Sequence, residues 1–141
     1  MNYNELIQLY FERSNALQGY WNLYVVVVGG LLAFSSLRKE PAAITTLIVS
    51  VLFCLFAYEN HDAIQVATAQ RLATHEAITK FNAGAAEPTA KQVRDVLEPT
   101  LTPASHGGVR MTHVTSDVLV LAALWAMELR RRRLKEGTVK S

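Results

Sequence analysis

Residues that could hold a metal ion or exchange protons gather in one stretch of the chain, residues 59–113, and just beyond it. All four histidines lie there, one of them in the group ENHD that opens the stretch. His113 stands four residues before Asp117, a spacing that places two side chains on one face of a helix. Imidazole and carboxylate groups are common ligands of zinc and other divalent metals, and imidazole changes its charge near pH ~6.5. The candidates for a metal or pH-sensing site are therefore Glu59, His61, Asp62, His113 and Asp117.

An ordinary solvated surface is the alternative explanation for these residues, because no pair of histidines has the H-E-x-x-H spacing of a helical zinc site. The sequence also contains no glycine-rich nucleotide loop and no nucleophile elbow. It therefore predicts no catalytic residue and no cofactor other than a divalent metal. Cys54 is the only cysteine, which excludes an intrachain disulfide. The net charge of +2 does not indicate a nucleic-acid partner, and no small-molecule substrate is identifiable.

Small and polar residues recur inside two uncharged stretches of the chain. They are Asn22, Gly29 and Ala33 in the first stretch and Thr46, Ser50 and Cys54 in the second. In lipid, small residues at four-residue spacing let helices approach closely, so helix packing is the first interpretation. The alternative is that Thr46, Ser50 and Asn22 line a polar path through an oligomer.

The two uncharged stretches are long enough to cross a membrane. Residues 16–37 would form about 33 Å of helix, which exceeds the ~30 Å of a typical hydrocarbon core. Residues 42–58 lie at the short limit for a span, and Pro41 can open this second helix. Only residues 38–41 separate the two stretches, so the sequence predicts a helical hairpin.

A third apolar run, residues 118–127, is by itself too short to span and is equally typical of a core helix or an interfacial segment. Its position in the chain favours a span. Three crossings place Arg38 and Lys39 on the same side as Arg130, Arg131, Arg132 and Arg133, as the positive-inside rule requires. We therefore expect a third span over residues 115–131, with Asp117 as its N-cap.

The same rule gives an orientation. The N-terminus and residues 59–113 are expected outside, and the basic tail, residues 130–141, in the cytoplasm of a bacterial inner membrane. Five basic residues in the outer segment count against this orientation. The basic residues beside the spans are predicted to anchor the orientation and to contact lipid headgroups: Arg38, Lys39, Arg130, Arg131, Arg132 and Arg133. Glu128 precedes Arg131 and Arg132 at the spacing of an ordinary ion pair on a helix surface.

Helices are also expected outside the membrane. Asn2 and Glu5 have the spacing of a capping box, from which a helix enters the first span either straight or with a bend near Gly19. The second span is expected to continue to about residue 81, because no glycine or proline interrupts it. Thr89 is a predicted N-cap for a short helix that Pro99 ends.

Together these features predict one domain over residues 1–141: an all-α integral membrane protein with three transmembrane helices and a helical extramembrane segment between the second and third. Three short spans bury little surface against one another, so a homo-oligomer or a larger membrane complex is expected in addition to lipid. The first functional hypothesis is a non-enzymatic structural or accessory subunit of a membrane assembly. The alternatives are a homo-oligomeric channel lined by the second span, and a metal-dependent membrane enzyme that uses the outer His, Asp and Glu residues.

Overall fold

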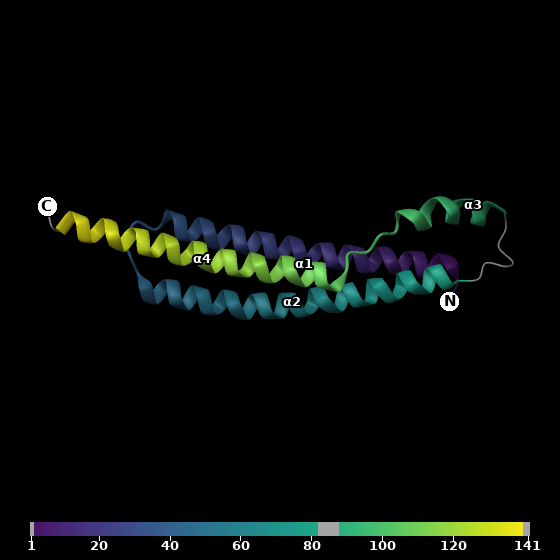
Figure 1. Cartoon of the computed structure of the whole chain (residues 1–141), viewed down its shortest axis with the longest axis horizontal. Helices are drawn as coiled ribbons and strands as arrows, with labels where there is room; N and C mark the ends of the chain where they lie inside the picture. The colour runs from purple at the N-terminus through teal and green to yellow at the C-terminus, as the bar shows by residue number, and fades with distance from the viewer. Residues whose placement is uncertain (1, 82–87, 140–141) are drawn as a thin grey trace.

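Three long helices lie side by side and form a rod, with a fourth, short helix beside one end (Figure 1). The structure, a computed structural model, describes residues 2–81 and 88–139. Its helices are α1 (Tyr3–Leu37), α2 (Ala43–Lys80), α3 (Pro88–Leu97) and α4 (His106–Val139), and a 3-10 turn, η1 (Glu98–Thr100), follows α3. This confirms the predicted all-α fold, with three long helices and a helical segment between the second and third.

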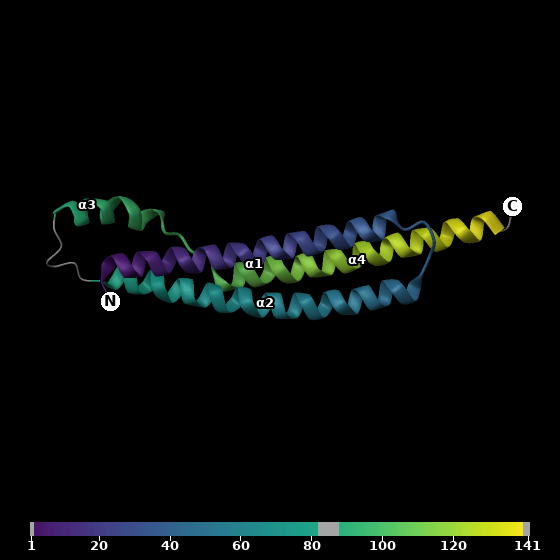
Figure 2. The same ribbon diagram turned by 180° about the vertical axis from the view of Figure 1, so that it is seen from behind.

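The rod has two different ends (Figures 1 and 2). The link between α1 and α2 and the C-terminal part of α4 lie at one end, which we call the loop end. The start of α1, the end of α2 and α3 lie at the other end, which we call the stalk end. Because α4 begins part-way along the rod, the stalk consists of α1 and α2 with α3 beside them.

Helix α1 runs without a break from the stalk to the loop end. It begins at the predicted capping box, in which the Asn2 side chain accepts a hydrogen bond from the Glu5 amide and the Glu5 carboxylate accepts one from the Asn2 amide. At Gly19 the helix continues, and a Cβ atom added there would meet nothing within 4 Å. Of the two arrangements open from the sequence, the straight helix is therefore the observed one.

Helix α2 confirms the predicted extension beyond the second span, since it continues to Lys80. Its start differs slightly from the prediction. The first helical residue is Ala43 and the N-cap is Ala42, so Pro41 lies before the helix rather than in its first turn.

Helices α3 and α4 begin earlier than their predicted caps. The first residue of α3 is Pro88, so Thr89 is inside the helix and the predicted N-cap is wrong. The first residue of α4 is His106, so Asp117 lies eleven residues inside the helix and is not its cap. The side chain of Ser105 has that role, because its Oγ accepts a hydrogen bond from the Gly108 amide at 3.1 Å.

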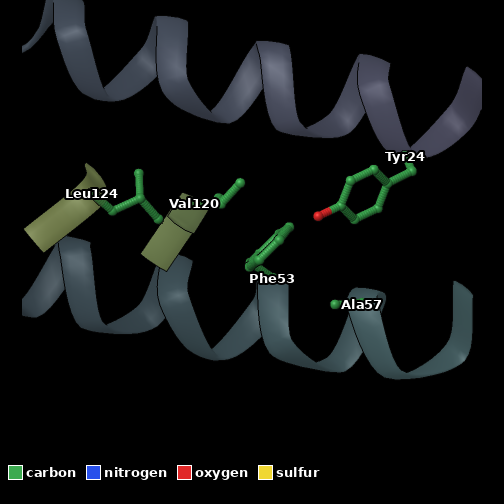
Figure 3. Close-up of a cluster of buried hydrophobic side chains, with 5 residues drawn as sticks. All are labelled: Tyr24, Phe53, Ala57, Val120 and Leu124. Carbon is green, nitrogen blue, oxygen red and sulfur yellow. The ribbon is translucent and has the colours of Figure 1, made fainter. Parts of the chain in front are cut away.

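Three apolar clusters follow one another along the interior of the rod. Nearest the loop end, all three long helices meet around a cluster of side chains that Figure 3 shows: Tyr24, Phe53, Ala57, Val120 and Leu124. Further along, Leu17, Ile64, Ala67 and Val109 pack together at the first turn of α4. In the stalk, Leu6, Tyr10 and Ile78 pack against Leu101, the residue after η1.

The outer surface of the rod is apolar over the predicted spans. On α2 large exposed hydrophobic side chains run from Ile44 to Tyr58, and α1 and α4 expose Val25, Val26, Val118 and Leu119 at the same depth. A surface of this kind is unfavourable in water and is typical of contact with lipid. Each of the three long helices is long and apolar enough to cross a membrane. The chain is therefore a membrane protein, and α2, at about 57 Å for its 38 residues, is longer than the ~30 Å hydrocarbon core.

Candidate functional site

A buried polar site joins the three long helices where the stalk begins, and we call it the histidine cluster (Tyr24, Asn60, His113 and Asp117). The His113 side chain is 0% exposed. Its Nδ1 lies 2.9 Å from one carboxylate oxygen of Asp117, and the Tyr24 hydroxyl donates to the other oxygen at 2.8 Å. The Asn60 side chain lies 3.3 Å from His113 Nε2. One residue from α1, one from α2 and two from α4 therefore form a continuous hydrogen-bonded chain.

The partners of His113 determine which of its nitrogens carries the proton. Asp117 is an acceptor when ionised, so Nδ1 donates to it, and Nε2 of the neutral ring is then the acceptor for the Asn60 amide. The rings of Trp21 and Tyr24 enclose the imidazole, with centroids 5.6 and 4.7 Å away. Both nitrogens are engaged, and the ring is shielded on the side of α1.

The structure brings together only part of the predicted metal or pH-sensing set. The ring of His61 lies 5.2 Å from that of His113, but Glu59 and Asp62 are exposed. His61 Nε2 accepts from the Gln65 amide at 3.4 Å rather than from a residue of the cluster. Among the residues that the structure describes, no group of three His, Cys, Asp or Glu side chains is placed to hold a metal ion.

A second buried polar site lies at the loop end, and we call it the glutamate cluster (Arg38, Thr46, Glu128, Arg131 and Arg132). The Glu128 side chain is 0% exposed. Arg131 and Arg132 each approach its carboxylate to 3.3 Å, the Arg38 guanidinium lies 3.7 Å away, and the Thr46 hydroxyl donates at 3.2 Å.

The glutamate cluster fastens α4 to both helices of the hairpin. Arg131 also donates to the backbone oxygen of Ser35 at 2.7 Å, and Arg38 donates to that of Ala42 at 3.1 Å. Three cations compensate the buried carboxylate, which would be very unfavourable alone. The cluster places Arg38 at the same end as the C-terminal arginines, the arrangement from which a third crossing was inferred. The expectation of an ordinary surface pair for Glu128 is wrong, because the carboxylate lies inside the bundle.

The small and polar residues of the first two spans divide into two groups. Thr46 is 2% and Ser50 7% exposed, and both face the interior of the bundle. Asn22, Gly29, Ala33 and Cys54 are exposed on the outer surface. Thr46 and Ser50 therefore pack within one chain, and a pore between copies could be lined by them only if α2 separated from α4.

Two of the residues that build these sites, Tyr24 and Asn60, were not predicted from the sequence, and Glu128 was predicted only as a member of a surface ion pair. Their partners lie 93, 53 and 82 residues away along the chain, so no local spacing indicates them. The one local signal was the charge of Glu128 directly after an apolar run.

No family model matches the chain, and neither a curated protein nor a solved structure matches it. The function is therefore argued from the geometry and chemistry of the bundle.

Proposed function

We propose that this protein is a non-enzymatic structural or accessory subunit of a membrane assembly, anchored by α1, α2 and α4. One observation carries the proposal. In the part of the chain that the structure describes, Nε of Arg71 and Nε of Arg131 are the only buried side-chain nitrogen or oxygen atoms without a hydrogen-bond partner. Transport and catalysis at membrane depth rely on polar groups that can engage an ion or substrate. Here those groups engage one another and hold the helices together.

The residues exposed on the outer surface of α1 support the proposal that this helix contacts a partner within the membrane. Besides large side chains such as Val26, its exposed positions include Asn22, Gly29 and Ala33. The exposed residues of α2 are mostly bulky, such as Leu47 and Leu55. Small side chains permit a close approach of another helix, and an exposed amide can hydrogen-bond across such a contact. We infer that α1 faces the assembly and that the bulky face of α2 faces lipid.

The distribution of charge supports the proposed orientation. The loop end carries seven basic and three acidic residues within residues 38–41 and 128–137. By the positive-inside rule this end lies in the cytoplasm, and the stalk and the N-terminus project from the other side of what we propose is a bacterial inner membrane.

Photo-crosslinking in native membranes tests the subunit role. A photoreactive amino acid is placed at Ala33 on α1 or, as a matched control, at Leu55 on α2; both positions are exposed at membrane depth. We expect Ala33 to form an adduct of defined mass with a polypeptide, and Leu55 to form adducts with lipid. Mass spectrometry of the adduct then separates a second copy of this chain from a different protein. Lipid adducts alone at both positions would contradict the proposal.

A further inference from the structure

The four consecutive arginines of α4 do not share one environment. Arg131 and Arg132 bind the buried carboxylate of Glu128. Arg130 and Arg133 are exposed, and neither makes a hydrogen bond or an ion pair with any residue that the structure describes. Two of the four cations stabilise the bundle, and the other two remain available to an external anion.

Arg130 and Arg133 lie beside a hollow of about 510 Å³ on the outer face of α4. The remaining lining is apolar: Ala126, Leu129 and Leu134. A second hollow at the same end, of about 320 Å³, has the carboxylates of Glu128 and Glu136 in its lining. Of these two hollows, the first combines unpaired positive charge with an apolar surface and has no acidic residue in its lining.

The depth of the first hollow matches the boundary between hydrocarbon and headgroups. Arg130 is three residues after Met127, the last residue of the apolar run, which corresponds to a rise of about 4.5 Å along the helix. Ala126 and Leu129 therefore lie at the edge of the hydrocarbon, and the two guanidinium groups lie at the level of lipid phosphates.

We propose that Arg130 and Arg133 form a binding site for the phosphate of an anionic phospholipid, whose acyl chain lies over Leu129 and Ala126. A guanidinium group can donate two parallel hydrogen bonds to a phosphate, and the excess of basic residues at the loop end adds a general attraction for anionic lipid. The apolar lining favours a lipid over free phosphate, which has no apolar part. The proposal requires only that the helices cross a membrane and does not depend on the subunit role.

The test uses the full chain in nanodiscs of phosphatidylcholine with a minor fraction of phosphatidylglycerol. Native mass spectrometry then measures which lipid remains bound after release of the protein. We expect the unaltered chain to retain phosphatidylglycerol selectively, and Arg130→Gln/Arg133→Gln to reduce that retention on the order of twenty-fold. The matched control, Lys135→Gln/Lys140→Gln, removes the same charge from the same basic tail and should preserve most of the selectivity. Equal losses in the two double variants would contradict a defined site.

Two further measurements separate the remaining explanations. Phosphatidylglycerol should raise the thermal unfolding midpoint of the chain in phosphatidylcholine nanodiscs, whereas inorganic phosphate should not; equal protection by phosphate would contradict a lipid site. The variant Arg130→Lys/Arg133→Lys keeps both positive charges. It is the control for the possibility that the glutamine variant loses lipid because it folds poorly. It should lose part of the retention because an ammonium group cannot form the paired contact. Retention equal to that of the arginines would contradict direct guanidinium–phosphate binding.

Discussion

At the scale of single residues, the stability of the bundle depends on one enclosed carboxylate and the arginines that surround it. The Glu128 carboxylate is enclosed, and its partners Arg38 and Arg131 are only 16% and 10% exposed. Removal of one member of a buried ion pair leaves the other charges without compensation, which is more damaging than the loss of a contact at the surface. Arg132 is 43% exposed, so water relieves part of this effect.

Glu128→Gln is therefore expected to lower the free energy of unfolding by about 3 kcal/mol, the lower end of the range for a broken buried pair. Chemical denaturation in detergent micelles measures this change. The matched control is Glu40→Gln, which also removes a glutamate at the loop end, but one whose side chain is 79% exposed and pairs with the exposed Lys135. Its effect should stay within about 0.5 kcal/mol. Equal effects of the two substitutions would show that the glutamate cluster does not hold the bundle together.

The roles of individual residues were harder to predict from the sequence than the helices that carry them. Spacing correctly placed His113 and Asp117 on one helix face, and they do bond one another. It could not reveal that Glu128 turns inward, because the same spacing to Arg131 and Arg132 fits an exposed pair equally well. What decides between the two cases is the position of Thr46 on α2 and of Arg38 directly after α1, which only the packed bundle provides.

At the scale of elements, helix interiors were predictable and helix starts were not. The apolar runs identified the cores of α1 and α2, and the capping box at Asn2 was recognised because both of its partners are local. The start of α4 was missed because Gly107 and Gly108 are typical of a loop. Tertiary packing outweighs that propensity, since Val109, just after the two glycines, is buried against Leu17, Ile64 and Ala67.

The continuity of α1 through Gly19 can be tested by substitution. In a helix interior alanine is favoured over glycine by up to about 1 kcal/mol, and nothing obstructs a Cβ atom at this position. Gly19→Ala should therefore raise the free energy of unfolding by roughly 0.5–1 kcal/mol. Gly137→Ala, near the end of α4 and equally unobstructed, should have a smaller effect because helix ends fray. A destabilising Gly19→Ala would indicate that α1 bends at this residue.

At the scale of the whole molecule, the number of crossings followed from a relation between distant parts of the chain. The length of the third apolar run did not establish a span, but the requirement that Arg38 and Lys39 share a side with the C-terminal arginines did. The structure satisfies this requirement directly, because Arg38 and Arg131 approach the same carboxylate. For α4, the side of the membrane on which the basic residues lie therefore predicted the span better than the hydropathy of its apolar run did.

The proposed orientation can be tested by labelling in intact cells. In a Cys54→Ser background, a cysteine replaces Ala104 at the stalk side of α4 or Gly137 at the loop end. A maleimide that cannot cross membranes should label position 104 in intact cells and position 137 only after permeabilisation. The reverse pattern would overturn the orientation, and labelling of both positions in intact cells would contradict an odd number of crossings.

The exposed apolar belt of α2 has a consequence for the surrounding bilayer. From Ile44 to Tyr58 the belt is about 21 Å long, whereas a typical hydrocarbon core is ~30 Å thick. A belt shorter than the core creates hydrophobic mismatch, which is relieved when the bilayer thins locally or when proteins with similarly short belts gather. The bilayer should therefore thin locally beside α2, and this deformation would act as a force that brings α2 together with neighbours whose apolar belts are similarly short.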